Sequence, residues 1–92
     1  MQSYTIVFTE PAISDLQNIR DYIGKENPSA ASRIAIQIVA ACDRLEYLPE
    51  RGRPGIVPGT RELVSYWPYT IVYRILKKNV EVLRIWHMHQ NR

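Results

Sequence analysis

Residues 9–49 read TEPAISDLQNIRDYIGKENPSAASRIAIQIVAACDRLEYLP and decide the fold, because this stretch contains the starts of two helices. The segments Thr9-Glu10-Pro11 and Asn27-Pro28 each combine an N-cap residue with a proline in the first helical turn. Apolar residues then recur on one helical face, at Ala12, Leu16, Ile19 and Ile23 and again at Ala31, Ile34, Ala35, Ile38, Ala41, Cys42, Leu45 and Leu48. We expect Gly24 to close the first helix and Pro49 to end the second, and the short connection predicts an antiparallel hairpin.

The flanking segments have the patterns of strands. Residues 4–9 alternate between two faces, and three runs near the end of the sequence, 60–65, 69–77 and 80–86, are rich in β-branched and aromatic residues. Residues 49–59 hold three prolines and three glycines and are expected to form a loop. This order predicts the α+β class, β-α-α-β-β-β, with the helical hairpin packed on one face of a small, mostly antiparallel sheet.

Composition sets the class of protein. The chain has 92 residues, of which 46% are hydrophobic and 23% charged, which fits one globular domain over 1–92 and excludes a disordered chain. The longest uncharged apolar stretch, 34–42, is far shorter than the roughly 20 residues that span a bilayer, so we expect no membrane association. Met1-Gln2-Ser3 does not lead into the apolar core of a secretory signal, and Cys42 has no second cysteine to pair with. We therefore expect a cytoplasmic protein.

Charge is distributed unevenly along the chain. The net charge is +3, but residues 1–46 carry four basic and six acidic side chains, whereas residues 47–92 carry eight basic and three acidic ones. A basic half favours an anionic partner, either nucleic acid or an acidic protein. The alternative is a solvated basic surface without a partner.

The sequence lacks the motifs of metal and nucleotide sites. His87-Met88-His89 would point two imidazoles to one side of an extended segment, but no third ligand is close in sequence. We therefore expect no metal and no cofactor.

Two arginines interrupt apolar strands and indicate a polar surface on the sheet. Arg74 and Arg84 project from one sheet face if even-numbered positions keep their orientation through the turn. We expect the face that the helices leave open to be a groove carrying Arg74 or Arg84 together with Arg61 and the histidines. The alternative is that each guanidinium forms a structural ion pair with Glu62 or Glu81.

Aromatic side chains surround these arginines. Trp67 could stack on a base or dock a partner, or it could cap the edge of the sheet. Tyr73 is expected in the core.

Several short motifs follow one another in a fixed order along nearly the whole chain. They are Thr9-Glu10-Pro11-Ala12 with Asp15-Leu16, Ile19…Tyr22-Ile23, Asn27-Pro28-Ser29-Ala30-Ala31, Leu45…Leu48-Pro49-Glu50-Arg51-Gly52-Arg53, Gly59-Thr60-Arg61-Glu62-Leu63, Tyr69-Thr70-Ile71-Val72-Tyr73-Arg74 and Val80-Glu81-Val82-Leu83-Arg84-Ile85-Trp86-His87. This set resembles the RelE/ParE toxin superfamily. The resemblance implies the toxin of a bacterial type II toxin–antitoxin pair, held in a hetero-oligomer by a cognate antitoxin whose acidic, poorly ordered tail wraps it.

The superfamily divides by target. RelE-like members are ribosome-dependent ribonucleases whose groove needs cations and a general acid or base. Arg61 matches the first basic position of that groove, but Leu63, Thr70 and Gln90 stand where further groups of the pattern are expected. His89 matches the catalytic histidine of the YoeB-like branch, without the tyrosine that follows it there. Asn27-Pro28-Ser29-Ala30-Ala31 and the ending Leu-Arg-Ile-x-His are closer to ParE-like members, which bind DNA gyrase and have no nuclease chemistry.

We therefore expect a ParE-like toxin that arrests growth by inhibiting DNA gyrase. The alternative is a RelE/YoeB-like mRNA interferase acting at the ribosome, with Arg61, His87 and His89 as its catalytic residues. The residues expected to contact the target or the antitoxin are Arg51, Arg53, Arg61, Trp67, Arg74, Arg84, His87 and His89.

Overall fold

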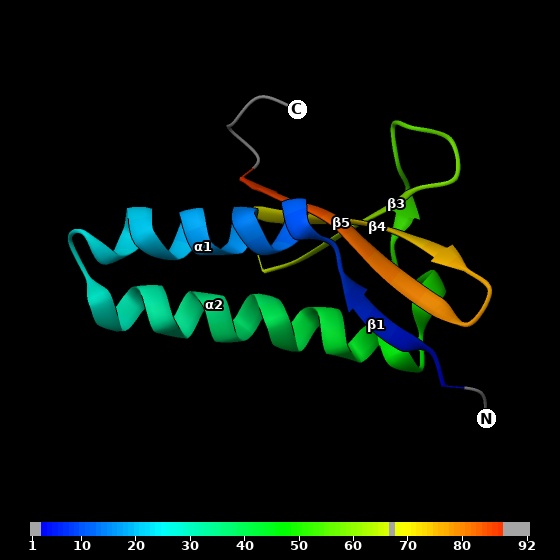
Figure 1. Cartoon of the computed structure of the whole chain (residues 1–92), viewed down its shortest axis with the longest axis horizontal. Helices are drawn as coiled ribbons and strands as arrows, with labels where there is room; N and C mark the ends of the chain where they lie inside the picture. The colour runs from blue at the N-terminus through cyan, green and yellow to red at the C-terminus, as the bar shows by residue number, and fades with distance from the viewer. Residues whose placement is uncertain (1–2, 67, 88–92) are drawn as a thin grey trace.

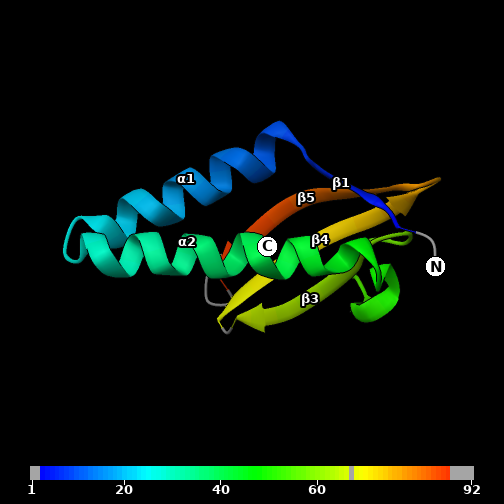
Figure 2. The same ribbon diagram turned by 90° about the horizontal axis from the view of Figure 1, so that it is seen from below.

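Two layers, one of helices and one of strands, make up the part of the chain that the computed structural model describes, residues 3–66 and 68–87. Figure 1 shows the order β1 (Thr5–Phe8), α1 (Glu10–Gly24), α2 (Pro28–Asp43), β3 (Arg61–Tyr66), β4 (Tyr69–Leu76) and β5 (Asn79–His87). Two 3₁₀ turns, η1 (Arg44–Glu46) and η2 (Pro49–Arg51), and the short strand β2 (Arg53–Pro54) connect α2 to β3. Figure 2 shows the helical hairpin on one side of the sheet, with its turn projecting beyond the strands. The predicted α+β architecture is confirmed.

The sheet has the order β1-β5-β4-β3-β2. The β1–β5 pair is parallel and the other pairs are antiparallel, so the sheet is mostly antiparallel, as predicted. The strand β2 was not predicted: it lies within the expected loop and pairs Arg53 with Glu62 and Pro54 with Arg61. A register shift between β4 and β5 places Val72 opposite Arg84 and Tyr73 opposite Val82, which leaves Leu83 as an extra residue.

Both helices begin where their caps predict. The Thr9 side chain accepts a hydrogen bond from the Ala12 amide at 3.4 Å, and its hydroxyl donates to the Val82 carbonyl at 2.8 Å. The Asn27 side chain accepts from the Ala30 amide at 3.0 Å. Thr9 therefore satisfies the start of α1 and also ties it to β5.

The helix ends are less well predicted. Gly24 is the last residue of α1, and Lys25 is the C-cap. The second helix ends at Asp43 instead of continuing to Leu48, whose side chain is 60% exposed. Leu48 precedes a proline, which disfavours helical backbone, and its φ of −131° and ψ of 63° lie outside the helical region. The apolar stripe ends instead at the buried Leu45.

The core lies between the hairpin and the sheet. Its fully buried members come from both layers and are Ala12, Ile38, Ala41, Cys42, Leu45, Ile71, Tyr73, Val80, Val82 and Ile85. The prediction that Tyr73 belongs to the core is confirmed. In the described part of the chain, neither helix is long and apolar enough to cross a membrane.

Candidate functional site

A cleft opens where the second half of β5 leaves the sheet pairing on one side. β1 pairs with β5 only as far as Val82, so β5 beyond this point faces α1 instead of another described strand. Asp15 of α1 closes this edge by accepting a hydrogen bond from the Ile85 amide at 3.0 Å. A backbone donor that the sheet leaves unpaired is thus satisfied by a helix side chain.

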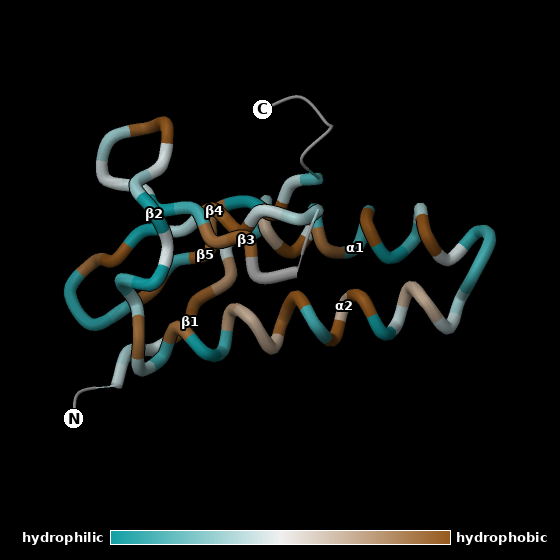
Figure 3. Tube along the Cα trace, turned by 180° about the vertical axis from the view of Figure 1, so that it is seen from behind, coloured by the Kyte–Doolittle hydropathy of each residue, from teal (hydrophilic) through white to brown (hydrophobic). Residues whose placement is uncertain are grey.

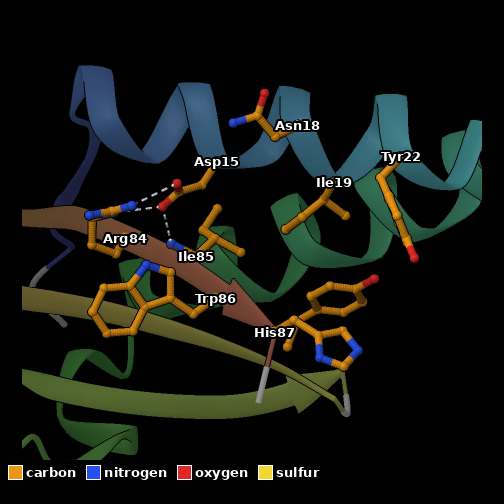
Figure 4. A pocket seen from close by; sticks show the side chains of 9 residues that line it. Asp15, Asn18, Ile19, Tyr22, Arg84, Ile85, Trp86 and His87 are labelled. Atoms are coloured by element: carbon orange, nitrogen blue, oxygen red, sulfur yellow. Dashed lines mark hydrogen bonds and ion pairs between the residues drawn. The ribbon is translucent and has the colours of Figure 1, made fainter. Parts of the chain in front are cut away.

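The same carboxylate holds Arg84. The Arg84 Nε donates to Asp15 Oδ2 at 2.8 Å and Nη2 donates to Oδ1 at 3.0 Å, which is a bidentate pair (Figure 4). The hydrogen bond to Asp15 raises the pKa of the Arg84 guanidinium, so it stays charged. The guanidinium carbon also lies 5.1 Å from the centroid of the Trp86 ring. These contacts fix Arg84 at one end of the cleft.

The rest of the cleft is an open, mixed surface of about 450 Å³. Asn18, Ile19 and Tyr22 line it from α1, and Trp86 and His87 line it from β5 (Figure 4). The Tyr22 side chain is 77% exposed. The ring of His87 packs edge-on against Tyr69, with centroids 5.4 Å apart and an interplanar angle of 89°. Exposed aromatics beside a charged pair suit protein recognition.

Arg61 belongs to a different cluster at the other end of the sheet. Its Nη1 donates to the carbonyl oxygens of Gly52 at 2.8 Å and Glu50 at 3.3 Å. The Tyr73 hydroxyl donates to the Pro49 carbonyl at 2.6 Å and accepts from the Gly52 amide at 2.9 Å. Burial raises the pKa of the Tyr73 phenol above its ordinary value. Arg61 and Tyr73 together anchor η2 to the sheet.

Gly52 is required in this cluster because the backbone packs closely there. A Cβ at this position would lie 2.7 Å from the Tyr73 hydroxyl oxygen and 2.9 Å from the Glu62 carbonyl oxygen. Any side chain would therefore displace the anchored turn.

The groove expected on the open face of the sheet is not assembled among the described residues. Arg74 and Arg84 do share one face, since Arg84 lies opposite Val72 on β4, but the turn does not keep even positions together, because Arg74 lies opposite Glu81; the register shift restores the shared face. Arg61 lies opposite Tyr73 and His87 lies opposite Tyr69, and both tyrosines are buried on the helix side. The β-sheet alternation thus places Arg61 and His87 on the other face from the two strand arginines.

The alternative of structural ion pairs with Glu62 or Glu81 is confirmed for Arg74, whereas Arg61 contacts backbone carbonyls instead. Arg74 Nε lies 2.5 Å from Glu81 Oε1, and Arg53 Nη2 lies 3.4 Å from Glu62 Oε1. For Arg84 the expected partners, Glu62 and Glu81, are wrong, because its partner is Asp15. No local pattern links residues 69 positions apart, so this pair needs the fold to be known.

The remaining site candidates divide into two groups. Arg51 is exposed at the end of η2 and borders a shallow concavity of about 510 Å³ with Tyr4, Tyr47 and Leu48. Trp67 and His89 lie outside the described residues, so the His87-Met88-His89 pair stays a prediction.

Sequence reasoning missed Asp15 and Tyr22. Both belong to motifs of the family resemblance, but no role in the site was predicted for either. The position of Asp15 between Ala12 and Ile19, one turn from each, is the signal that could have placed it at the border of the buried face. Beyond its motif, Tyr22 has no pattern that marks a site residue.

A family model for the ParE toxin of the type II toxin–antitoxin system parDE matches residues 6–92. The chain belongs to this ParE toxin family. It is therefore a toxin of the type II class, in agreement with the resemblance drawn from its motifs.

Relatives support the same family. The toxin is 43% identical over 91 residues to the putative toxin Y4kP of Sinorhizobium fredii, covering 98% of this chain and 94% of that protein. It is 44% identical over 82 residues to toxin RelE2 of Caulobacter vibrioides, covering 89% of this chain and 92% of that protein. A relative with a RelE name thus stands beside the match to the ParE family model.

Solved structures share the fold. A chain of the chromosomal ParDE toxin–antitoxin system from P. aeruginosa superposes with a TM-score of 0.86 at 28% identity, covering 95% of this toxin and 98% of that chain. A chain of the toxin–antitoxin complex RelBE2 from Mycobacterium tuberculosis superposes with a TM-score of 0.71 at 30% identity, covering 95% and 93%.

Proposed function

We propose that this toxin arrests growth by inhibiting DNA gyrase and that a cognate acidic antitoxin neutralises it. The choice of gyrase as the target rests on one observation: the arginines of the sheet already contact groups of the toxin itself. Arg53, Arg74 and Arg84 each pair with a carboxylate of the toxin itself, and Arg61 donates to two backbone carbonyls. A nuclease groove needs cations whose charge is available to the scissile phosphate, and these four are already engaged.

The positions of the described catalytic candidates support the same choice. Arg61 lies opposite Tyr73 and His87 opposite Tyr69, on strands that flank β4. Tyr69 and Tyr73 are four residues apart on β4, which is about 13 Å along the strand at the usual rise of an antiparallel strand. Arg61 and His87 therefore do not converge on one phosphate.

The names of RelE relatives favour a second candidate, a ribosome-dependent ribonuclease. In that function Arg61, His87 and His89 would be the catalytic residues. This function requires Arg61 to give up its hydrogen bonds to the carbonyls of Glu50 and Gly52. It also requires other catalytic groups to lie close to Arg61.

The antitoxin proposal rests on the cleft between α1 and β5. It combines the exposed Tyr22 with Asn18, Ile19 and Trp86 along an open concave surface, so it offers apolar and polar contacts to an extended tail. The solved relatives come from toxin–antitoxin complexes, which supports a partner of this kind.

A plasmid supercoiling assay with purified gyrase and antitoxin-free toxin tests the target. We expect inhibition at micromolar toxin, with cleaved plasmid accumulating on the same gel. His87→Ala is expected to inhibit equally well, because a gyrase inhibitor has no use for a general acid or base. Unaffected gyrase together with messenger RNA cleavage in a ribosome-containing translation mixture would establish the ribonuclease instead.

A further inference from the structure

The two strands that flank the loop 55–60 form a β-hairpin with an apolar tip. β2 pairs with β3 through Arg53–Glu62 and Pro54–Arg61, and the Gly55 amide continues the ladder by donating to the Thr60 carbonyl at 2.8 Å. We call residues 56–59, Ile-Val-Pro-Gly, the finger. Figure 1 shows this loop projecting from the sheet, and Figure 3 shows the hydrophobic colour at its tip.

Ile56 and Val57 are the most unusual residues of the finger. Their side chains are 78% and 62% exposed, so they contribute little to the core. Tyr47 and Leu48 are also adjacent, exposed and apolar, but they border a concave surface. The finger is convex, and it presents its apolar pair at the apex.

The backbone of the finger is held in one conformation. The Thr60 amide donates to the Val57 carbonyl at 3.1 Å, and the Thr60 hydroxyl donates to the same oxygen at 2.6 Å. Pro58 follows Val57, and Gly59 has a φ of +87°, which is the pattern of a type II turn with proline and glycine at its two central positions. A pre-ordered tip loses little conformational entropy when it binds.

We propose that the finger is the element with which the toxin engages its target, by inserting Ile56 and Val57 into an apolar pocket of DNA gyrase. This inference rests on the gyrase function proposed above and adds the docking element. A rigid, convex pair of β-branched side chains fits a concave pocket on a folded protein. A poorly ordered antitoxin tail works the opposite way, because it brings its own flexible side chains to concave surfaces of the toxin.

The surroundings of the finger agree with an apolar anchor. The two arginines at its base, Arg53 and Arg61, are held by Glu62 and by backbone carbonyls. The apolar pair is therefore the part of the finger that offers a contact at the tip.

The test compares two toxin variants in the gyrase supercoiling assay. Ile56→Thr/Val57→Thr keeps both side chains β-branched and uncharged but makes them polar. Ile36→Thr is the matched control, because Ile36 is 65% exposed on α2, away from the hairpin. We expect the finger variant to need at least about tenfold more toxin for half-inhibition, since two apolar groups lose their burial at the interface. The control should match the unmodified toxin, and all three should melt at similar temperatures.

Each result decides a different question. Equal inhibition by the finger variant and the unmodified toxin overturns the finger proposal and leaves the gyrase function standing. An equal loss in the Ile36→Thr control also overturns it, because the effect would not be specific to the finger. If the unmodified toxin does not affect gyrase, the proposed function fails and the finger proposal fails with it.

Discussion

At the scale of single residues, Asp15 links a side chain and a backbone group of β5 to α1. It accepts two hydrogen bonds from the Arg84 guanidinium and one from the Ile85 amide. The Asp15 side chain is 13% exposed and that of Arg84 is 44% exposed. Solvent therefore screens the arginine's charge, and the backbone contact gives Asp15 the larger share of the stability.

This difference predicts an order of stability for two alanine variants. Asp15→Ala should lower the free energy of unfolding by about 1–3 kcal/mol, because it leaves the Ile85 amide without its partner. Arg84→Ala should lower it by only about 0.5–1 kcal/mol, because Asp15 can still accept from that amide. Urea unfolding at pH 7 measures both. Equal losses would show that the ion pair, and not the backbone contact, stabilises this edge.

Cys42 predicts a loss of stability in alkali. Burial raises the pKa of its thiol to about 12, whereas an unfolded cysteine ionises near its ordinary value of about 8.5–9. Above pH 9 the unfolded state therefore binds fewer protons than the folded state, and stability falls as the pH rises, by up to about 1.4 kcal/mol per unit. Urea unfolding at pH 7.5 and pH 10 should show this decline, and Cys42→Ala should make it smaller. An identical decline in both proteins would assign it to other groups, such as Tyr73.

At the scale of elements, local signals predicted where the two helices begin. Contacts between residues far apart in the sequence determine where α2 ends and where β2 forms, and these two features were not predicted. Thr9 and Asn27 cap their helices through atoms three residues away, which a sequence pattern can record. The Glu46 carbonyl, by contrast, accepts a hydrogen bond from the Tyr4 amide at 2.8 Å, and β2 exists only because β3 lies beside it. The end of α2 and the hairpin at residues 53–62 therefore depend on partners that no local pattern specifies.

The anchoring of η2 predicts that one hydroxyl stabilises a whole element. Tyr73→Phe removes the donor to the Pro49 carbonyl and the acceptor of the Gly52 amide, and the Gly52 bond is buried. We expect the free energy of unfolding to fall by about 1–3 kcal/mol. Tyr22→Phe removes the same atom from a side chain that is 77% exposed, and it should change stability by less than about 0.5 kcal/mol. If the two variants unfold at the same urea concentration, the hydroxyl does not hold η2.

At the scale of the whole molecule, the sequence predicted the family and the order of elements better than the arrangement of the site. Arg74 and Arg84 do lie on one face, but the reason differs from the predicted one. The turn sets even positions of β4 opposite odd positions of β5, as in the Arg74–Glu81 pair, and the register shift at Leu83 brings Arg84 back opposite Val72. The Asp15 partner of Arg84 and the opposite facing of Arg61 were not foreseen, because the packing of α1 against β5 sets the first and pairing across strands sets the second. The result is a toxin with two distinct surfaces: a cleft between α1 and β5, and the convex finger on the β2–β3 hairpin.

This separation predicts that antitoxin binding and target binding respond to different substitutions. Mixing the toxin with its antitoxin, at about 100 times the Kd, should stabilise it by about 2.7 kcal/mol. For a domain of this size such a gain raises the melting temperature by more than about 10 °C. Tyr22→Ala, in the cleft, should reduce this rise at a fixed antitoxin concentration, whereas Ile56→Thr/Val57→Thr should leave it unchanged. A flat melting temperature at saturation would contradict the antitoxin proposal, and a loss caused by the finger variant would show that the two surfaces are not separate.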